Sequence, residues 1–388
     1  MTRHEIALLN NIADAGIDAL GTNYTTSDSL VGATGALVRS APMHELEFPN
    51  TLLAIARAGA GTNNIPLERA TDAGIVVFNT PGANANAVKE LVICAMLSVA
   101  RNLLDAVSWV ETVKSSATLQ NDVEKGKKVF VGRELKGKVL GVIGLGAIGS
   151  EVATAAASLG MKVFGYDPYL DPKTAEKLPA SVKTTTKLTK LLSQSDFISL
   201  HIPLNAQTRE IISSDTLAEA KRGVVVLNFA RGELVDDSEM GIALKNGVVS
   251  RYVTDFPNEI TANMAGCVTI PHLGASTVES EINCAVMAAQ ELTDYLENGN
   301  ITHSVNLPTC SLGPLKDPAR ICVMHKNVPN MLASITSVLG SNHININDMS
   351  NRAQGNIAYV MFDVAELVDA EIIEKISNID GVVRVRVL

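Results

Sequence analysis

The segment around residue 146 contains a glycine pattern suited to holding a phosphate group. Gly144, Gly146 and Gly149 form the pattern G-x-G-x-x-G, which follows an apolar run and precedes a helical pattern. The first glycine permits a tight turn, the second lets the backbone approach a pyrophosphate, and the third lets helix and strand pack closely. The N-terminus of the helix then offers N–H groups and a partial positive charge to phosphates. The pattern therefore predicts a dinucleotide site.

An acidic residue downstream indicates which dinucleotide binds. Asp167 lies 18 residues after Gly149, at the end of the next apolar run. A carboxylate there accepts hydrogen bonds from the ribose hydroxyls and would repel the 2′-phosphate of NADP. The turn Gly144–Gly149, with Ala147 opening the predicted helix, is therefore expected to bind NAD together with Asp167.

Polar side chains that suit a redox reaction follow three later strands of the predicted sheet. Arg231, Glu259 and His272 each come after an apolar run that ends in a polar loop. Ligands of such sheets bind beyond the carboxyl ends of the strands. We therefore expect these side chains at the same edge of the sheet as the dinucleotide.

These residue types fit the oxidation of an alcohol by hydride transfer. Histidine accepts the hydroxyl proton near neutral pH, and a carboxylate orients the imidazole and favours its protonated form. Arginine holds a substrate carboxylate with two parallel hydrogen bonds. His272, Glu259 and Arg231 can fill these roles, although the residues alone leave open that all three are solvated loop residues. His201 also follows a strand, but Pro203 favours a structural loop there.

The composition limits the class of protein. The chain has 388 residues, 46% hydrophobic and 19% charged, which predicts a soluble globular protein of two to three domains. A net charge of −9 argues against nucleic-acid binding, and the apolar run at 91–100 is too short to cross a membrane. Five cysteines without a CxxC pair predict reduced thiols and a cytoplasmic location, and no cluster has metal-ligand spacing.

The apolar runs that must position these residues fall into three groups. The first two groups alternate with helical patterns, which predicts two doubly wound parallel α/β domains with a long helix from Ala85 to Lys114 between them. The third group follows a linker at 306–316 and has the order βαββαβ of a ferredoxin-like module. The predicted strands are 6–9, 36–38, 52–56, 75–78, 138–143, 162–166, 197–200, 224–227, 252–254, 267–270, 321–325, 345–351, 357–364 and 382–387.

Several segments, in this order along the chain, resemble the D-isomer-specific 2-hydroxyacid dehydrogenases. They are residues 57–64, 79–81, 144–149, 201–204, 228–235 and 271–277. The resemblance implies a flavodoxin-like substrate domain, a Rossmann NAD domain and a C-terminal ACT domain. Their expected boundaries are 1–88 with 285–310 for the substrate domain, 89–284 for the NAD domain and 311–388 for the ACT domain.

The resemblance also implies roles for individual residues. Arg231 would bind the substrate carboxylate, His272 would act as the acid and base, and Glu259 would be its partner. The segment Arg57, Ala58 and Gly59 would bind the substrate together with Arg231 and His272. Further cofactor contacts are implied for Thr80, Ile148, Thr208, Ala230, Asp255, Gly274 and Ala275.

The reaction that the resemblance implies is the oxidation of 3-phospho-D-glycerate to 3-phosphooxypyruvate, the first step of phosphorylated L-serine biosynthesis. One alternative is a reductase of hydroxypyruvate, glyoxylate or 2-oxoglutarate. A third hypothesis, from another class, is an NADH-sensing scaffold with little catalysis. The intact set of Arg231, Glu259 and His272 argues against the scaffold.

The resemblance also implies an effector site in the C-terminal module, and the chain departs from the family pattern at three places. An ACT domain implies L-serine as an effector bound by His325, Asn327 and Asn345, and a homodimer or homotetramer. Asn330 stands where the family has a glycine after the proline of this module, and Asn63 stands where the family has an aspartate. The family reads Asp-Val-Phe where this chain has Asp255-Phe256-Pro257, so one residue is missing before Glu259.

Overall fold

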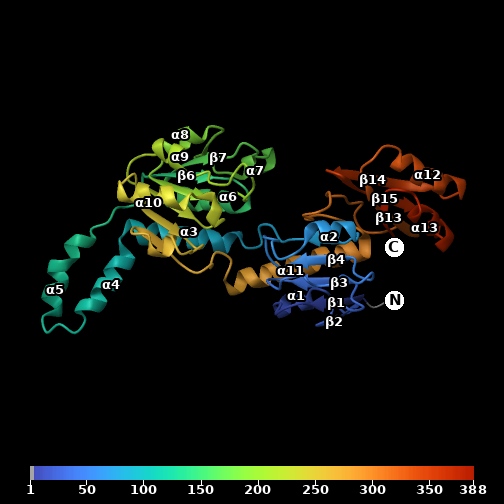
Figure 1. Cartoon of the computed structure of the whole chain (residues 1–388), viewed down its shortest axis with the longest axis horizontal. Coiled ribbons are helices and arrows are strands. Elements are labelled where there is room, and N and C mark those ends of the chain that lie inside the picture. Colours follow the sequence, from blue (N-terminus) through green and yellow to red (C-terminus); the bar gives the residue numbers. More distant parts are fainter. Residues whose placement is uncertain (1–3) are drawn as a thin grey trace. The chain divides into compact units, whose positions relative to one another are not determined.

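The computed structural model describes residues 4–388, and the chain forms two compact units (Figure 1). The central unit comprises Ala85–Thr277. The terminal unit comprises the chain up to Asn84 together with Val278–Leu388. The first parallel sheet and the C-terminal module therefore belong to one compact unit.

A seven-stranded parallel sheet forms the middle of the central unit. Its order is β12-β11-β10-β9-β6-β7-β8, so the chain reverses direction across the sheet between β6 and β9. This is the Rossmann order, which places a ligand crevice at the reversal. The strands are β6 (Val139–Ile143), β7 (Lys162–Tyr166), β8 (Lys183–Thr185), β9 (Phe197–Leu200), β10 (Val224–Asn228), β11 (Val249–Thr254) and β12 (Cys267–Thr269).

Helices cover both faces of this sheet. One face packs against α3 and α6 through residues such as Val92 and Val152, and the other packs against α8, α9 and α10 through residues such as Leu191 and Met240. Burial on both faces explains why the middle strands are almost entirely apolar. The helices are α3 (Ala85–Ala100), α4 (Leu103–Val113), α5 (Leu119–Gly126), α6 (Ala147–Ser158), α7 (Pro172–Lys177), α8 (Leu188–Leu192), α9 (Ser214–Ala218) and α10 (Asp237–Lys245), with 3-10 turns η1 (Lys127–Phe130), η2 (Gly232–Leu234) and η3 (Thr261–Asn263).

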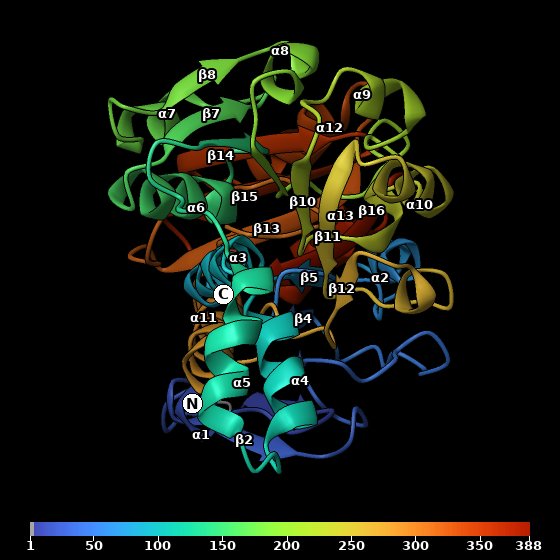
Figure 2. The same cartoon turned by 90° about the vertical axis from the view of Figure 1, so that its left-hand side faces the viewer.

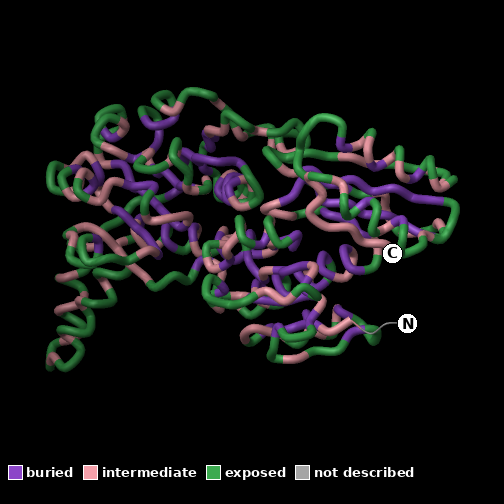
Figure 3. Tube along the Cα trace, turned by 45° about the vertical axis from the view of Figure 1, so that its right-hand side comes forward, coloured by how far each residue is buried: buried purple, intermediate pink, exposed green. Residues whose placement is uncertain are grey.

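The prediction of one helix from Ala85 to Lys114 is wrong. The chain bends by 60° between α3 and α4, where Asn102 has a left-handed φ of 51°. Helices α4 and α5 then extend from the sheet as a hairpin, which faces the viewer in Figure 2. Neither helix buries a residue, and Figure 3 draws this hairpin in green and pink while the strands are largely purple.

The terminal unit contains a second parallel sheet and the C-terminal module. The parallel sheet has the order β2-β1-β3-β4-β5, which is that of flavodoxin-like domains. Helix α2 covers one face, and α1 and α11 cover the other. These elements are β1 (His4–Leu8), β2 (Tyr24–Ser27), β3 (Gly35–Val38), β4 (Ala54–Arg57), β5 (Val76–Phe78), α1 (Asp14–Asp18), α2 (Leu67–Asp72) and α11 (Val278–Asn298).

The C-terminal module has the predicted βαββαβ order and an antiparallel sheet ordered β14-β15-β13-β16. Helices α12 and α13 cover one face. The other face, through Met324 and Tyr359, joins the apolar cluster that contains Tyr295 of α11. The elements are β13 (Ala319–Lys326), α12 (Met331–Ser341), β14 (Ile346–Gln354), β15 (Ile357–Val364), α13 (Ala370–Ser377) and β16 (Val382–Val387).

The predicted fold class is confirmed, with two doubly wound parallel sheets and a ferredoxin-like module. Strands β2 and β8 are additions that the sequence did not indicate, and both contain mainly polar residues. Each lies at the edge of its sheet, where a strand has only one neighbour and needs no apolar run.

Candidate active site

The turn after β6 has the geometry that its glycines predict. Gly144 has a φ of 91°, and a β-carbon there would lie 2.4 Å from the backbone oxygen of His201. A β-carbon on Gly149 would lie 1.8 Å from the backbone oxygen of Gly144. Both positions therefore require glycine, because backbone atoms would occupy the space of any side chain.

Gly146 differs from its two neighbours because the space beside it is open. It is the N-cap of α6, and a β-carbon built there meets no heavy atom within 4 Å. Open space at a helix N-terminus lets an anionic group approach the backbone N–H groups. Gly146 thus fits the pyrophosphate of a dinucleotide, with Ala147 and Ile148 beginning the helix behind it.

Asp167 stands one residue after β7, beside this turn. Its Oδ2 accepts a hydrogen bond of 2.9 Å from the N–H of Leu145, and its Oδ1 accepts one of 2.9 Å from the N–H of Tyr169. Each carboxylate oxygen has a second acceptor site. The half-buried carboxylate is thus held against the turn and keeps acceptor capacity for two ribose hydroxyls.

The loop after β9 lies across the reversal point of the sheet from this turn. The ring of His201 contacts Ser199, with 2.8 Å between Nε2 and Oγ, and burial lowers the pKa of His201 to about 3. A histidine with that pKa is a poor base at neutral pH, which agrees with its predicted structural role. Thr208 donates through Oγ1 to the backbone oxygen of Pro203 at 2.7 Å, so its hydroxyl shapes this loop, and its cofactor contact stays a prediction.

A buried asparagine holds the loop that carries Arg231. The Nδ2 of Asn228 donates to the backbone oxygen of Arg231 at 2.8 Å, and its Oδ1 accepts from the N–H of Ala230 at 3.2 Å. Asn228 is fully buried at the end of β10. Sequence reasoning did not select Asn228, although a polar residue closing an apolar strand is the signal that could have identified it.

Asp255 is a fully buried carboxylate at the end of β11. Its Oδ2 accepts a hydrogen bond of 2.9 Å from the N–H of Gly274, while its Oδ1 is buried without a partner. Burial raises the pKa of Asp255, and the nearby charges of His272 and Arg231 oppose that rise. A buried oxygen without a hydrogen-bond donor lowers the stability of the folded protein. The Oδ1 atom of Asp255 therefore fits an N–H donor from a ligand, such as the carboxamide of a nicotinamide.

The remaining members of the predicted trio lie on loops. His272 is exposed, and its ring lies 4.6 Å from the ring of Phe256, measured between centroids, with 50° between the planes. Glu259 is also exposed, and its carboxylate makes no hydrogen bond or ion pair with any residue in the range 4–388. The structure therefore brings Arg231 and His272 near Asp255, and the pairing of Glu259 with His272 stays a prediction.

The predicted substrate segment begins at Arg57, the last residue of β4 in the terminal unit. Gly59 has a φ of 150°, and a β-carbon there would collide with the guanidinium of Arg57, which lies over this glycine. Arg57 Nε donates to the backbone oxygen of Arg39 at 3.0 Å. Arg39 follows β3, pairs with Glu281 at 2.7 Å, and is a second cation at this sheet edge that sequence reasoning did not select.

Thr80 lies next to the same segment. Its N–H donates to the backbone oxygen of Gly59 at 3.2 Å, which joins the two loops. Its hydroxyl oxygen is buried and has no hydrogen-bond partner. Such an oxygen fits the predicted contact with a ligand group, and Ala58, which is buried, adds only backbone atoms to this edge.

The three predicted effector residues do not converge within one chain. His325 is buried near the end of β13, with an unpartnered Nε2, and Asn327 donates to the backbone oxygen of Gly355. Asn345 precedes β14 at the opposite end of the sheet. On β15, Ala358 pairs with His325, and Val364 pairs with Ile346, the residue after Asn345. The six residue steps from Ala358 to Val364 correspond to roughly 20 Å.

The described residues also bear on metal binding and on membrane insertion. Between His4 and Leu388, no group of three or more His, Cys, Asp or Glu side chains is placed to hold a metal ion. Within that range, no single helix has the length and apolar composition to cross a membrane, although α3 and α4 together reach that length and composition across a bend of 60°.

Comparison with known proteins places these features in a family. Residues 93–274 match the family described as D-isomer specific 2-hydroxyacid dehydrogenase, NAD binding domain. The chain is 34% identical over 354 residues to a D-3-phosphoglycerate dehydrogenase of Methanocaldococcus jannaschii, which covers 87% of this chain and 65% of that protein. It is 32% identical over 358 residues to the Haemophilus influenzae protein of that name, covering 88% of this chain and 83% of that one.

A solved structure supports the same conclusion. The NAD+-bound 3-phosphoglycerate dehydrogenase of Entamoeba histolytica aligns with a TM-score of 0.62 and 27% identity, over 78% of this chain and 98% of that one. The chain spans about two thirds of the length of the archaeal relative and more than four fifths of the bacterial one. The glycine turn, Asp167 and the strand-end residues lie within the matched region. This chain belongs to the D-isomer specific 2-hydroxyacid dehydrogenase family.

Proposed function

We propose that the chain oxidises 3-phospho-D-glycerate to 3-phosphooxypyruvate with NAD, as the first step of phosphorylated L-serine biosynthesis. The observation that carries this proposal is the buried Asp255, which lies near the charges of both His272 and Arg231 at the strand ends beside the glycine turn. The names of the relatives supply the substrate.

The chain's own residues divide the work of the reaction. NAD, when bound at Gly144–Gly149 and Asp167, supplies the hydride acceptor. His272 takes the proton from the substrate hydroxyl, because an imidazole exchanges protons near neutral pH. Arg231 binds the substrate carboxylate, and the hydrogen bonds of Asn228 fix the loop from which the guanidinium extends.

The substrate phosphate requires cations from the chain itself, because the net charge of −9 repels anions at long range. Arg57 is the last residue of β4, Arg39 directly follows the neighbouring strand β3, and the two lie close together. The N–H groups of Ala58 and Gly59 donate to the backbone oxygens of Val38 and Arg57, so these two residues shape the edge while the arginines supply its charge. We assign the phosphate to this edge.

The test is a panel of substrates measured with NADH and NADPH. We expect rapid NADH oxidation with 3-phosphooxypyruvate, and Arg231→Ala and His272→Ala each lower turnover about 10²–10⁴-fold. Arg209→Ala is the matched control, because Arg209 is exposed and its side chain has no described contact. Higher kcat/KM with hydroxypyruvate, glyoxylate or 2-oxoglutarate would replace the substrate, and NADH binding without turnover would favour the sensing scaffold.

The hairpin of α4 and α5 carries our proposal that the protein is a homodimer or homotetramer. Leu103, Leu104, Val107 and Val110 of α4 are 42–57% exposed. An apolar row of this kind on a hairpin without a described partner fits burial against a second copy.

We also propose L-serine as an effector of the C-terminal module. The unpartnered Nε2 of buried His325 fits a polar ligand. Because Asn345 lies at the far end of the sheet, a second copy must supply that end of the site. His325→Ala should remove inhibition of the dehydrogenase by L-serine, and wild-type enzyme that ignores L-serine would refute the proposal.

We also propose that the protein is located in the cytoplasm. All five cysteines are free in the structure, and reduced thiols are the rule in the cytosol.

A further inference from the structure

Strand β11 carries a tyrosine in the apolar layer between the seven-stranded sheet and α10. Tyr252 is fully buried there with side chains such as Val226 and Met240. It pairs with Val226 of β10, and residues two apart along a strand share a face, so Tyr252 lies on the same face as Asn228. A buried tyrosine hydroxyl normally has a hydrogen-bond partner. The hydroxyl of Tyr252 therefore calls for a polar group near the strand ends.

That polar group is the asparagine that closes β10. Asn228 donates through Nδ2 to Oη of Tyr252 at 3.3 Å and to the backbone oxygen of Arg231 at 2.8 Å. Its Oδ1 accepts from the N–H of Ala230 at 3.2 Å. A side-chain amide has two N–H donors and one oxygen, so these three contacts fix its plane. The orientation of the amide that holds the loop of Arg231 thus depends on the hydroxyl of Tyr252.

The same hydroxyl also reaches the end of its own strand. It interacts with the side chain of Thr254, which is fully buried and accepts the N–H of Phe256 at 3.1 Å. Burial raises the pKa of Tyr252 well above its usual value, and the hydrogen bond from Asn228 opposes that rise. The phenol therefore stays neutral near pH 7, and it joins the ends of β10 and β11 without adding a charge.

We propose that Tyr252 is a positioning residue for the substrate carboxylate, which acts through Asn228 on the loop of Arg231. This inference rests on the proposed function, in which Arg231 holds that carboxylate. Tyr252 is fully buried, so it acts from below the surface that the ligands reach. Without its hydroxyl, a buried N–H of Asn228 loses its acceptor, which is unfavourable. The amide is then free to rotate, and the loop of Arg231 loses the contact that sets its path.

The experiment compares Tyr252→Phe with wild type in the reduction of 3-phosphooxypyruvate by NADH. Phenylalanine keeps the ring and removes only the hydroxyl. We expect KM for the 2-oxo acid to rise roughly 5- to 20-fold, the effect of about one lost hydrogen bond on binding. The dissociation constant of NADH and kcat should change less than about threefold, because Arg231 binds the carboxylate in both the ground state and the transition state. The inhibition constant of oxamate, a stable mimic of a 2-oxo acid, should rise with KM.

A double variant tests whether the effect passes through Arg231. In the background of Arg231→Ala there is no guanidinium left to position. Adding Tyr252→Phe to that background should therefore change KM less than about twofold, because two residues that act through one contact are not additive. An increase as large as in wild type would show that Tyr252 acts by another route, and would overturn the proposal.

The matched control is Tyr359→Phe in the terminal unit. Tyr359 is also fully buried, and its hydroxyl donates to the backbone oxygen of Gly299 at 2.9 Å. Loss of either hydroxyl should lower the melting temperature, since each leaves a buried polar group without its partner. Only Tyr252→Phe should change KM and the inhibition by oxamate. A Tyr252→Phe protein that loses stability but keeps its KM would show that the tyrosine is only structural.

A second variant covers the case in which Tyr252→Phe does not fold, which loss of NADH binding would reveal. Thr254→Val keeps the shape of the side chain and removes the hydroxyl that interacts with Tyr252. It should raise KM in the same direction, and an unchanged KM overturns the proposal.

Failure of the proposed function is seen separately, as wild-type enzyme that does not reduce 3-phosphooxypyruvate. The variants are then compared with whichever 2-oxo acid of the panel the wild type reduces, or by the binding of oxamate to the NADH complex. Wild type that binds neither a 2-oxo acid nor oxamate overturns both the function and the role of Tyr252.

Discussion

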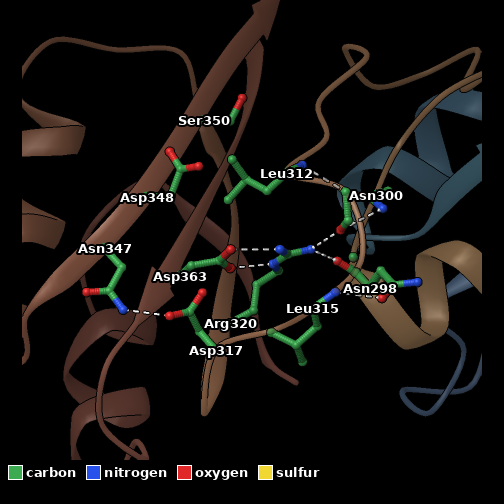
Figure 4. Close-up of polar contacts among 12 residues, drawn as sticks. Asn298, Asn300, Leu312, Leu315, Asp317, Arg320, Asn347, Asp348, Ser350 and Asp363 are labelled. Atoms are coloured by element: carbon green, nitrogen blue, oxygen red, sulfur yellow. Dashed lines mark hydrogen bonds and ion pairs between the residues drawn. The ribbon is translucent and has the colours of Figure 1, made fainter.

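Arg320 and Asp363 form a two-point ion pair in the interior of the terminal unit (Figure 4). Nε donates to Oδ1 at 2.5 Å, and Nη2 donates to Oδ2 at 2.8 Å. Nη1 donates to the backbone oxygens of Asn298 and Gly313, each at 2.7 Å. The guanidinium therefore ties the antiparallel sheet to the C-terminal end of α11, where unpaired carbonyls attract a cation.

Removing one member of this pair leaves a buried charge without a partner. Arg320→Met is expected to destabilise the terminal unit by about 3–5 kcal/mol, because Asp363 remains buried. The double variant Arg320→Met, Asp363→Leu should recover much of that loss. Thermal unfolding of the single and double variants measures this, with Lys375→Met as the control for an exposed pair. A double variant no more stable than Arg320→Met would contradict the argument.

Replacing Gly146 or Gly149 of the nucleotide turn by alanine should affect two different properties, NAD binding in the first case and stability in the second. Gly146→Ala should fold normally but bind NAD more weakly, since its β-carbon enters open space where the pyrophosphate is expected. Gly149→Ala should lower the melting temperature, because its β-carbon would lie 1.8 Å from the backbone oxygen of Gly144. Melting curves and NADH fluorescence titrations separate the two effects. Equal melting temperatures for the two variants would contradict this prediction.

The charge of Asp167 should set the preference for NAD over NADP. In Asp167→Asn the side chain keeps its size and one acceptor oxygen, but it no longer repels a 2′-phosphate. We expect the ratio of kcat/KM for NAD to that for NADP to fall about tenfold, which corresponds to about 1.4 kcal/mol. Asp215→Asn, at an exposed acidic residue of α9, is the control. An unchanged ratio would mean that another group selects the cofactor.

A buried carboxyl in α11 should make stability depend on pH. Glu291 lies 2.5 Å from Nδ1 of His303, its other oxygen has no partner, and burial raises its pKa to about 8. Between its ordinary pKa of 4.5 and about 8, the folded state holds a proton that the unfolded state has lost. Stability should therefore fall as pH rises through this window, by about 1.4 kcal/mol per pKa unit of difference.

The matched variants for this pH effect are Glu291→Gln and Glu47→Gln. Glutamine cannot ionise, so Glu291→Gln should flatten the decline in melting temperature between pH 5 and about 8. Glu47 lies exposed in a loop, and its replacement should leave the decline in place. A wild-type melting temperature that rises over this window would show that Glu291 is ionised in the folded protein.

The exposed row of α4 gives a test of assembly. Val107→Asp places a charge on a helix that buries no residue in the described chain, so the isolated chain should fold as before. If α4 packs against a second copy, the same change should convert the oligomer to monomers. Light scattering and melting curves decide this, with Thr112→Asp on the same helix as a control. An oligomer that persists in Val107→Asp would place the interface elsewhere.

The sequence predicted the fold well where strands are buried on both faces. Strands β6, β9 and β10 appear as apolar runs because helices cover both sides of their sheet. The edge strands β2 and β8 are polar and gave no such signal. The bend at Asn102 also escaped prediction, because apolar periodicity continues on both sides of a single residue in the left-handed conformation.

The candidate site was predicted in part for a similar reason. Residues at strand ends can be found from the chain, since the topology alone brings them to one edge. Contacts between loops cannot be predicted from the sequence in this way, because they depend on the path that each loop takes. Glu259 and His272 fit a pattern of residue types, yet the imidazole contacts Phe256. The burial of Arg320 likewise depends on contacts with distant segments, since Asn298 of α11 and Gly313 supply carbonyl oxygens to its guanidinium.

The antiparallel sheet and α11 share one apolar core, in which Met324 and Tyr359 pack with Tyr295 and Leu296. The C-terminal module is therefore not a cassette that can be exchanged freely between dehydrogenases. A chain shortened to about residue 310 would expose the aromatic and aliphatic side chains of α11 to water and should aggregate. A transplant of the module to another dehydrogenase would have to bring the matching surface of this helix with it.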